Sequence, residues 1–381
     1  MKIALLVSGL PPERVGGAER QACQAAAHLA ARHDVCVLTR TAEVPPQLAS
    51  QSRCVVTRRC RVNVPGLRFG ADIMQTLVHL GRARKSIDVI LAYQTVIDGL
   101  IAVLARMCFG IPVIVSIRCD TEYLLEDFQS RMFSAFVYEH ADFVAVQSPA
   151  IGEELTAVFT QRGGKPTADE LRKKIFVLPN GISPVTPRHV AGSGVVFIGR
   201  LTAQKGVNVL IDAMRQCPDE HLTIVGDGPD RAALERSASG LRNVTFTGML
   251  SHAQAQQRLS QAMVLVLPSR HEGQPNVLME AMSLGVPVIA SRVGGVADLV
   301  SDGETGLLTA PGDAHAIASG IRRISTDEAF RTMLAANALR AIRRYAWPDA
   351  AQALEEKLKA VEGAKATALA GRNYRRVSGS P

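Results

Sequence analysis

The sequence predicts an α/β protein built from two doubly wound, parallel-sheet domains. Short apolar runs alternate with amphipathic segments along the chain, which is the rhythm of a parallel sheet covered by helices on both faces. This rhythm lapses at residues 183–193 into a segment rich in Pro, Ser and Gly, and then restarts. The length of 381 residues also suits more than one domain. We therefore expect a first domain at 1–182, a linker at 183–193 and a second domain at 194–345.

The apolar runs are too short for helices and are predicted as buried strands. In the first half they are Ile3–Val7, Val35–Leu38, Val89–Leu91, Val113–Ile117, Phe143–Val146 and Phe176–Leu178. In the second half they are Val195–Ile198, Leu222–Val225, Val244–Phe246, Val264–Leu267 and Val286–Ala290. Helical patterns lie between them, for example Ala18–Arg32 and Gly99–Met107. A last helix is expected at 348–362, packing back on the first domain, followed by a disordered basic tail at 363–381.

Composition narrows the class of protein and its partners. A content of 47% hydrophobic and 20% charged residues excludes a disordered or collagen-like chain. The formal net charge of +8 suits anionic partners, namely nucleic acid, an acidic membrane surface or phosphorylated small molecules. Seven cysteines without a CxxC pair favour reduced thiols in the cytoplasm over disulfides or a zinc site. The most apolar stretch, residues 89–117, is broken by Gly110 and Pro112, so we expect no transmembrane helix.

Two carboxylates follow the predicted strand Val264–Leu267. Glu272 lies in the loop, and Glu280 lies about one turn into the next helix, whose expected N-cap is Asn276. A helix N-terminus offers unpaired N–H groups to an anion, and carboxylates accept hydrogen bonds from vicinal diols. Two such Glu residues are common on surface helices, but here Gly and Pro residues frame them between two buried strands. The segment therefore predicts a site for a phosphorylated sugar.

Cations and glycines follow other strands. Arg200 and Lys205 come after the strand Val195–Ile198 and beside a helix start, where they could neutralise a diphosphate. Alone, this segment would equally fit surface charge that flanks a helix. Gly16 and Gly17 follow the first strand and allow backbone amides to approach a phosphate, which is a weak signal. The GxGxxG and P-loop patterns are absent, which disfavours a nicotinamide dinucleotide site.

Taken together, these segments resemble the family 4 retaining glycosyltransferases, which have the two-domain GT-B fold. The resemblance covers nearly the whole chain and is most specific in Pro268-Ser-x-x-Glu-Gly-x-Pro-x-x-x-x-Glu-Ala281. The family's Glu-x7-Glu signature falls on Glu272 and Glu280. The resemblance implies two Rossmann-like domains that face each other across a cleft. Further matching segments are 199–206, 225–229, 246–248, 285–291, 303–307, 16–19 and 179–181.

The resemblance implies a role for each matching residue. Glu280 would accept hydrogen bonds from the nucleotide ribose, and Glu272 would contact the transferred sugar. Arg200 and Lys205 would stabilise the diphosphate leaving group. Gly17 would let a loop of the first domain close over the phosphates. Sugar hydroxyls and phosphate would be held at the loop and helix start formed by Gly273, Gln274, Asn276 and Val277.

Two positions depart from the family pattern. Arg118 stands where many members have a His; a guanidinium cannot act as a base, but it can hydrogen-bond a sugar or a phosphate. We therefore include Arg118 among the catalytic candidates. Ser183 stands where an Asp is common, and we interpret its turn, Asn180 to Ser183, as structural.

The implied activity is that of a retaining hexosyltransferase, which moves a sugar from a nucleotide-diphosphate sugar to a hydroxyl acceptor. It would need no metal ion or other cofactor, and it would act in bacterial-type polysaccharide, lipopolysaccharide or glycolipid synthesis. We favour front-side displacement, in which the departing phosphate takes the proton of the acceptor. The alternatives are a phosphorylase or epimerase of the same fold, and a catalytically silent sugar-nucleotide-binding subunit. The presence of Arg118 in place of the usual His keeps the silent subunit as an alternative.

The basic stretch, residues 53–85, carries eight cations against Asp72 alone. A helix predicted at 70–86 has one apolar face, made of Ile73, Met74, Leu77, Val78 and Gly81. This is either a surface helix with its apolar face in the core, or a patch for an anionic membrane surface or a polyphosphate acceptor. The second reading predicts a lipid-linked acceptor and a peripheral position on the inner face of the cytoplasmic membrane. Nucleic acid is not expected, because aromatic residues are not interleaved with the cations. The cations are Arg53, Arg58, Arg59, Arg61, Arg68, Arg82, Arg84 and Lys85.

Overall fold

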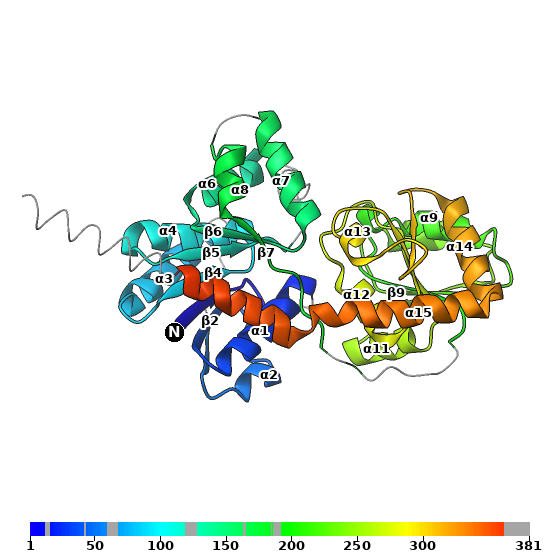
Figure 1. Ribbon diagram of the computed structural model, residues 1–381, viewed down its shortest axis with the longest axis horizontal. Helices are drawn as coiled ribbons and strands as arrows, with labels where there is room; N and C mark the ends of the chain where they lie inside the picture. Colours follow the sequence, from blue (N-terminus) through cyan, green and yellow to red (C-terminus); the bar gives the residue numbers. More distant parts are fainter. Residues whose placement is uncertain are drawn as a thin grey trace, which may run out of the picture. The chain divides into compact units, whose positions relative to one another are not determined.

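The chain divides into two compact α/β units (Figure 1). One unit is formed by Met1–Gly181 together with the segment from Trp347 onward, and the other by Ile182–Ala346. Most of the expected linker and the whole tail at 363–381 lie outside the described residues. The computed structural model describes residues 1–361 apart from 12–15, 42, 59–67, 119–127, 163–164, 184 and 186–191.

The first unit is built on a parallel sheet. Its strands are β1 (Lys2–Leu6), β2 (Asp34–Thr39), β3 (Cys54–Arg58), β4 (Val89–Ala92), β5 (Val113–Ser116), β6 (Phe143–Val146) and β7 (Ile175–Val177). Within the described residues they form a seven-stranded sheet in the order β3-β2-β1-β4-β5-β6-β7. Ile3 lies opposite Val35 on one side and Val89 on the other, and every neighbouring pair is parallel. The strand order reverses beside β1, which is where ligands bind in such sheets.

Helices cover both faces of this sheet. Side chains alternate along β1, so Ile3 and Leu5 belong to one buried cluster, whereas Ala4 and Leu6 belong to another. The first cluster also contains residues of α1 and of a last helix at 347–361, and the second contains residues of α4. The helices are α1 (Gly17–Ala30), α2 (Pro46–Ala49), α3 (Arg68–Ala83), the π-helical turn η1 (Thr95–Gly99), α4 (Leu100–Phe109), α6 (Phe128–His140), α7 (Pro149–Arg162) and α8 (Ala168–Lys174).

The last helix packs against α1, as the predicted fold requires. Trp347 at its start is buried and stacks on His28 of α1, with ring centroids 5.1 Å apart. Gly181 leaves room for this ring, because a Cβ there would lie 2.3 Å from Cδ2 of Trp347. The Gln21 side chain fixes the same point by donating to the Gly181 carbonyl (2.8 Å) and accepting from its N–H (2.9 Å). The C-terminal helix therefore completes the first unit.

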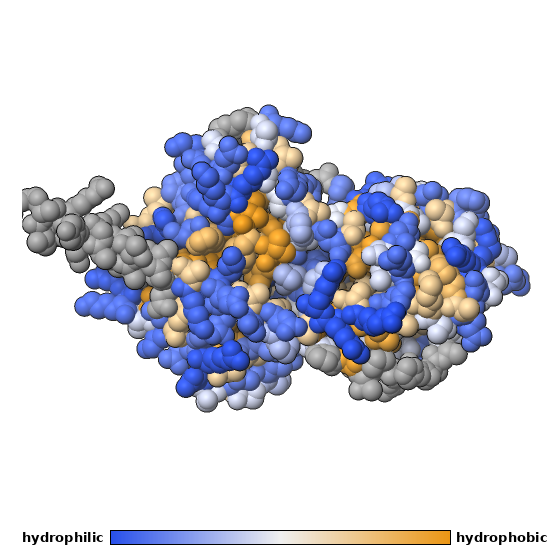
Figure 2. All heavy atoms as spheres, viewed as in Figure 1, coloured by the Kyte–Doolittle hydropathy of each residue, from blue (hydrophilic) through white to orange (hydrophobic). Residues whose placement is uncertain are grey.

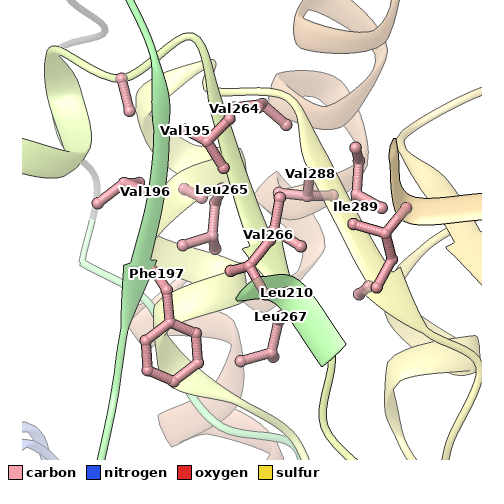
Figure 3. Packing of buried hydrophobic residues seen from close by; sticks show 14 of the residues in the cluster. Val195, Val196, Phe197, Leu210, Val264, Leu265, Val266, Leu267, Val288 and Ile289 are labelled. Carbon is pink, nitrogen blue, oxygen red and sulfur yellow. The ribbon is translucent and has the colours of Figure 1, made fainter. Parts of the chain in front are cut away.

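The second unit repeats the architecture. Its strands are β8 (Val195–Ile198), β9 (Leu222–Val225), β10 (Val244–Gly248), β11 (Val264–Leu267), β12 (Val288–Ser291) and β13 (Leu307–Thr309). They form a six-stranded parallel sheet in the order β10-β9-β8-β11-β12-β13 within the part that the structure describes. All residues of the central strand β11 are buried, and Figure 3 shows them packed among side chains of β8 and β12. This continuous apolar run is what the sequence rhythm predicts for a strand covered on both faces.

The helices of the second unit surround this core. One buried cluster contains residues of the four central strands and of α9, α12, α14 and α15 (Figure 1). The elements are η2 (Ala203–Lys205), α9 (Val207–Met214), α10 (Arg231–Ser237), α11 (His252–Ser260), α12 (Asn276–Leu284), α13 (Val296–Leu299), α14 (Ala314–Thr326), α15 (Glu328–Ile342) and η3 (Arg343–Tyr345).

Two edge strands were not predicted. In β3 the side chain of Val55 is 62% exposed, so this edge strand does not show the apolar run of a buried strand. The strand β13 has three residues, of which Leu307 and Leu308 are only half-buried. Strands at the edge of a sheet pack on fewer neighbours, so their sequences carry a weaker signal.

The apolar face expected on α3 is divided between the core and solvent. The alternative in which this whole face packs in the core was therefore wrong. Ile73 and Leu77 pack against the core, and Gly81 faces the ring of Phe109. Met74 and Val78 are instead 62% and 43% exposed. Figure 2 shows hydrophilic residues over much of the visible face of each unit, with hydrophobic areas between them. The cations Arg59 and Arg61, and the side chains of Arg58 and Arg68, lie outside the described part of the structure.

The length and apolarity of the helices can be compared with the expectation that the chain has no transmembrane helix. Within the described ranges, none of them is both long enough and apolar enough to cross a bilayer. The longest helix of the first unit, α3, has 16 residues and carries polar side chains throughout.

Candidate functional site

Lys205 and Glu272 form an ion pair at the carboxyl edge of the second sheet. The Nζ atom of Lys205 lies 2.6 Å from Oε1 of Glu272, which also accepts a 2.6 Å hydrogen bond from the hydroxyl of Ser269. The Glu272 side chain is 7% exposed and that of Lys205 is 22% exposed. Lys205 ends η2, which follows β8, whereas Ser269 and Glu272 follow β11. The structure therefore brings together two predicted site residues that the sequence separates widely.

Backbone contacts hold these two loops together. Gly206 has a φ of +63°, and a Cβ there would lie 2.1 Å from the carbonyl oxygen of Pro268. The N–H of Arg270 donates to the Gln204 carbonyl (2.8 Å), and the Gln204 side chain donates to the His271 carbonyl (3.1 Å). Only glycine combines that left-handed conformation with so close an approach of two backbones. The position of the Lys205 ammonium is therefore set by the backbone on either side of it.

The loop after β11 leads into α12. The prediction that Asn276 is the N-cap was wrong by one residue: the carbonyl of Pro275 accepts from the N–H groups of Leu278 and Met279, so Pro275 takes the N-cap position. Asn276 is the first helical residue and is half-buried. Glu280 lies about one turn further along and is also half-buried. Both carboxylates of the Glu-x7-Glu pattern thus lie along one short segment.

The remaining residues of this segment differ in burial. Gly273 and Gln274 are buried, with Gln274 5% exposed, and Val277 packs against the core of the second unit. The N–H of Gly295, in the loop after β12, donates to the carbonyl of Glu272 (3.3 Å). Three neighbouring strand ends, those of β8, β11 and β12, therefore meet at Glu272.

Arg200 follows β8, as Lys205 does, and is exposed. The loop that carries it packs closely on the loop after β9: Gly226 has a φ of +137°, and a Cβ there would lie 1.9 Å from the Gly199 carbonyl oxygen. The N–H of Leu201 also donates to the Asp227 carbonyl (2.9 Å). Among the described residues, no side chain binds the Arg200 guanidinium. The two predicted cations therefore differ, since Lys205 is paired and Arg200 faces solvent.

The other two candidates, Gly17 and Arg118, belong to the first unit. Gly17 is exposed and is the first residue of α1, with Gly16 as N-cap. The carboxyl group of Glu19 lies against Gly16, where a Cβ would come within 2.1 Å of Oε2. This N-terminus, which the sequence predicts as a phosphate site, thus already has a carboxylate beside it.

Arg118 follows β5 and is half-buried. Its Nε donates to the Ser116 hydroxyl (2.8 Å), and its Nη1 donates to the side-chain oxygen of Asn180 (2.6 Å). Its guanidinium carbon lies 5.0 Å from the centroid of the Tyr93 ring. Burial lowers the pKa of Arg118, and the neighbouring Tyr93 hydroxyl opposes this effect.

Sequence reasoning missed a partner of Glu272 and a partner of Arg118. Ser269 holds Glu272, and Asn180 holds Arg118, although the turn at Asn180 was interpreted as structural only. Each of the two residues comes two positions after a predicted strand run, and that position is the signal that could have found them. For metal binding, the described residues contain no group of three His, Cys, Asp or Glu side chains that could hold an ion.

Family comparisons agree with this architecture. Residues 16–164 match the family described as "Glycosyl transferase 4-like domain", and residues 192–327 match "Glycosyl transferases group 1". The two matches fall in the two compact units and together cover more than half of the chain.

Individual proteins are similar over different lengths. A sulfoquinovosyl transferase of Arabidopsis thaliana is 30% identical over 233 residues, which cover 56% of this chain but only 43% of that protein. A kanosaminyltransferase of Streptomyces kanamyceticus is matched over 39% of its length, so the chain spans less than half of these two relatives. A glycogen synthase of Mycobacterium tuberculosis is 27% identical over 370 residues, covering 86% of this chain and 87% of that one.

Solved structures show the same fold. The sucrose-phosphate synthase of Thermosynechococcus elongatus has a TM-score of 0.79 and 25% identity, covering 95% of this chain and 99% of that one. HepE of Anabaena in complex with UDP-glucose has a TM-score of 0.77 and 22% identity, covering 94% and 100%. The two parallel-sheet units thus have the GT-B fold. With both family matches in place, the chain belongs to the group 1 glycosyltransferases.

Proposed function

We propose that this chain is a retaining, metal-independent hexosyltransferase that moves a sugar from a nucleotide-diphosphate sugar to a hydroxyl acceptor. Membership of a glycosyltransferase family supports sugar transfer, and solved structures of HepE with UDP and UDP-glucose support a nucleotide-sugar donor. The observation that carries the donor site is the Lys205–Glu272 pair beside the start of α12. Its ammonium is ordered by a carboxylate before any substrate arrives.

Lys205 and Arg200 are the proposed partners of the diphosphate. Negative charge grows on this leaving group as the bond to the sugar breaks, so fixed cations act where charge develops. Lys205 is fixed by Glu272 and by the tight approach of Gly206 to Pro268. Arg200 is exposed and supplies a planar fork that suits phosphate oxygens.

Glu272, Glu280 and the start of α12 are the proposed sugar and ribose partners. Both hydrogen bonds to the Glu272 side chain reach Oε1, and no described residue donates to Oε2. Oε2 can therefore accept from a hydroxyl of the transferred sugar without losing Lys205. Glu280 would accept from the ribose hydroxyls, and the loop and helix start at Gly273, Gln274, Asn276 and Val277 would hold the sugar hydroxyls and phosphate.

The proposed reaction is a front-side displacement. The acceptor oxygen forms a bond to the anomeric carbon on the face that the diphosphate leaves, so the configuration is retained. The electron pair of the broken bond stays on the phosphate oxygen, which takes the proton of the acceptor hydroxyl. Gly17 and Arg118 are proposed to act from the first unit, Gly17 by letting backbone approach a phosphate and Arg118 by hydrogen bonding.

Glycosyl transfer is tested on the purified full-length chain with UDP-, GDP- and ADP-sugars and an extract of hydroxyl acceptors. We expect one donor class to release its nucleoside diphosphate only when an acceptor is present. The product should keep the anomeric configuration of the donor, and the activity should be unchanged by EDTA. Donor binding without any release would instead identify a silent binding subunit. Inverted product would contradict retention, and loss of activity with EDTA would contradict a metal-independent reaction.

We also propose that α3 brings the chain to an anionic membrane surface, where polysaccharide or glycolipid acceptors are anchored on lipid. Met74, Val78 and Arg82 are exposed, and helical spacing places them on one side of α3. Lys85 is exposed in the turn that follows the helix. Cations beside exposed apolar side chains fit a leaflet of acidic lipids, with about 1 kcal/mol per basic residue near the surface.

Co-sedimentation with vesicles of phosphatidylcholine, with and without phosphatidylserine, tests this surface at low and high salt. We expect binding that needs the anionic lipid and that falls when Arg82 and Lys85 are changed to Ala. A matched double variant on the exposed helix α8, Arg172→Ala with Lys173→Ala, should bind like the wild type. Binding that ignores the lipid charge or the α3 variants would reject the surface.

A further inference from the structure

Four neighbouring strand ends of the first sheet converge on Arg118. Ser116 ends β5, Tyr93 follows β4, Gln147 follows β6 and Asn180 comes shortly after β7. The Asn180 side-chain oxygen accepts from both Arg118 (2.6 Å) and Gln147 (3.1 Å), so the amide is oriented by two donors. Asn180 and Gln147 are 3% and 4% exposed, and Tyr93 is 1% exposed. The guanidinium is therefore held in one place by a buried network.

Every partner of this guanidinium among the described residues is neutral. Ser116 offers a hydroxyl, Asn180 an amide oxygen and Tyr93 an aromatic ring. Two other half-buried arginines of this unit, Arg40 and Arg106, are paired with carboxylates. Arg40 is paired with Asp72, and Arg106 makes hydrogen bonds of 2.7 and 2.8 Å to Asp142. Arg118 thus loses part of its hydration without gaining an opposite charge from any described residue, which is costly for a cation.

Donor groups are still available on Arg118. A guanidinium has five N–H groups, and the bonds to Ser116 and Asn180 use one each on Nε and Nη1. Even when the contact with the Tyr93 hydroxyl is counted, the described residues leave more than one N–H group without a partner. The side chain is half-buried rather than sealed, so a ligand can reach these groups at the carboxyl edge of the sheet.

We propose that Arg118 is the centre of an oxyanion subsite in the first unit, which takes a carboxylate or phosphate group of a sugar substrate. The planar fork of an arginine binds either group through two parallel hydrogen bonds. Such a ligand would supply the opposite charge that no described residue supplies. This inference rests on the proposed function, and it specifies that function further: one of the sugars that the enzyme handles is acidic.

The subsite is tested by calorimetric binding of glucose, glucuronate and glucose 6-phosphate to the full-length protein. We expect one of the two acidic sugars to bind at least tenfold more tightly than glucose, and which one it is distinguishes a carboxylate from a phosphate. In Arg118→Gln this preference should disappear. Lys205→Ala should keep the preference and weaken the binding of UDP, because Lys205 is the proposed partner of the donor diphosphate.

A second variant covers the case in which Arg118→Gln does not fold. Asn180→Asp keeps the size of the side chain but places a carboxylate beside the guanidinium, so it should abolish the preference by supplying the missing charge. Equal binding of all three sugars by the wild type would overturn the subsite. So would a preference that survives in Asn180→Asp or that depends on Lys205 instead. A preference that needs Arg118, in a protein that transfers no sugar from any donor, would support the subsite and contradict the proposed function.

Discussion

The carboxyl edges of the two sheets hold their cations in opposite ways. In the second unit, Lys205 is paired with the buried carboxylate of Glu272, and its loop is fixed by the close approach of the Gly206 backbone to the Pro268 carbonyl. In the first unit, the described residues that contact Arg118 are neutral, and the side chains that hold it, Ser116, Asn180 and Tyr93, are each at most 3% exposed. One edge is charge-compensated and set by the main chain, whereas the other has no carboxylate partner among the described residues and is set by side-chain contacts.

This difference shows how one architecture can serve two kinds of ligand. A paired cation is already neutralised, so a diphosphate must share Lys205 with Glu272, and the carboxylate keeps the ammonium in place. An unpaired cation costs folding free energy, and an anion that binds there returns part of that cost. The two edges should therefore respond differently to small substitutions.

The largest effect is expected where the backbone sets the site. Gly206→Ala would force an alanine to a φ of +63° and place its Cβ 2.1 Å from the Pro268 carbonyl oxygen. We expect the free energy of unfolding of the second unit to fall by about 3 kcal/mol and glycosyl transfer to be lost. Thermal unfolding measures the loss of stability, and acceptor-dependent release of the nucleoside diphosphate measures the loss of transfer.

Gly240→Ala is the matched control. Gly240 has a φ of +86° but no atom within 4 Å of its Cβ position, so only conformational strain is added, about 1 kcal/mol. If the two alanine variants lose equal stability, the close approach at Pro268 does not determine the position of Lys205.

The next largest effect concerns the ion pair itself. Lys205→Ala leaves the Glu272 carboxylate without its cation, and Glu272→Gln removes the charge that orients the ammonium. Each should lower kcat/KM by tenfold or more, which corresponds to about 1.4 kcal/mol. Steady-state kinetics with the preferred donor gives this value. Arg215→Ala, which breaks an exposed ion pair with Asp212, should leave kcat/KM unchanged. Near-wild-type kinetics in Lys205→Ala would refute its assignment.

Much of the second edge could be predicted from the sequence because its parts are local. Glu272 and Glu280 lie in one loop and helix, and glycines at tight approaches are visible as residue types. The N-cap was misplaced by one residue because Pro275 and Asn276 both suit a helix start, and hydrogen bonding decides between them. The fold class was predicted because buried strands show continuous apolar runs, which the edge strands β3 and β13 lack.

The first edge was harder to predict because its network joins distant parts of the chain. Asn180 lies 62 residues from Arg118, and Gln147 lies 33 residues from Asn180. Amide and hydroxyl side chains occur throughout the sequence, and only the strand order β4-β5-β6-β7 brings these together.

A smaller effect is expected when the first edge is made to resemble the second. Asn180→Asp gives Arg118 a carboxylate partner in place of an amide oxygen that lies 2.6 Å away. The free energy of unfolding should rise by about 1 kcal/mol, because the charge is compensated and the hydrogen bond becomes charge-assisted. Chemical denaturation followed by the fluorescence of Trp347, the one tryptophan of the chain, reports on this unit. A destabilised variant would show that the neutral network is preferred for packing, contrary to the comparison.

The smallest effect is a pH dependence of the first unit, at the contact between α1 and the last helix. His33 is 7% exposed, and its Nε2 lies 3.4 Å from Oε1 of Glu355, which also binds Lys359 at 2.6 Å. Burial lowers the pKa of His33 below its ordinary 6.5, against the opposing effect of Glu355. The hydrogen bond from Lys359 lowers the pKa of Glu355 below 4.5.

Both shifts make the folded unit less stable in acid. Below about pH 6.5 the unfolded chain binds a proton at His33 that the folded chain resists, so stability falls as pH falls. The contribution of Glu355 is present above pH 4.5 and is lost only as pH falls through its lowered folded pKa, so a step from about pH 7.5 to about pH 5.5 isolates His33. Thermal unfolding followed by Trp347 should show a lower Tm at about pH 5.5, and His33→Gln should reduce this difference. An equal response in wild type and His33→Gln would place the titrating group elsewhere in the molecule. The acid sensitivity of the first unit would then have to be sought at a contact other than the one that docks its last helix.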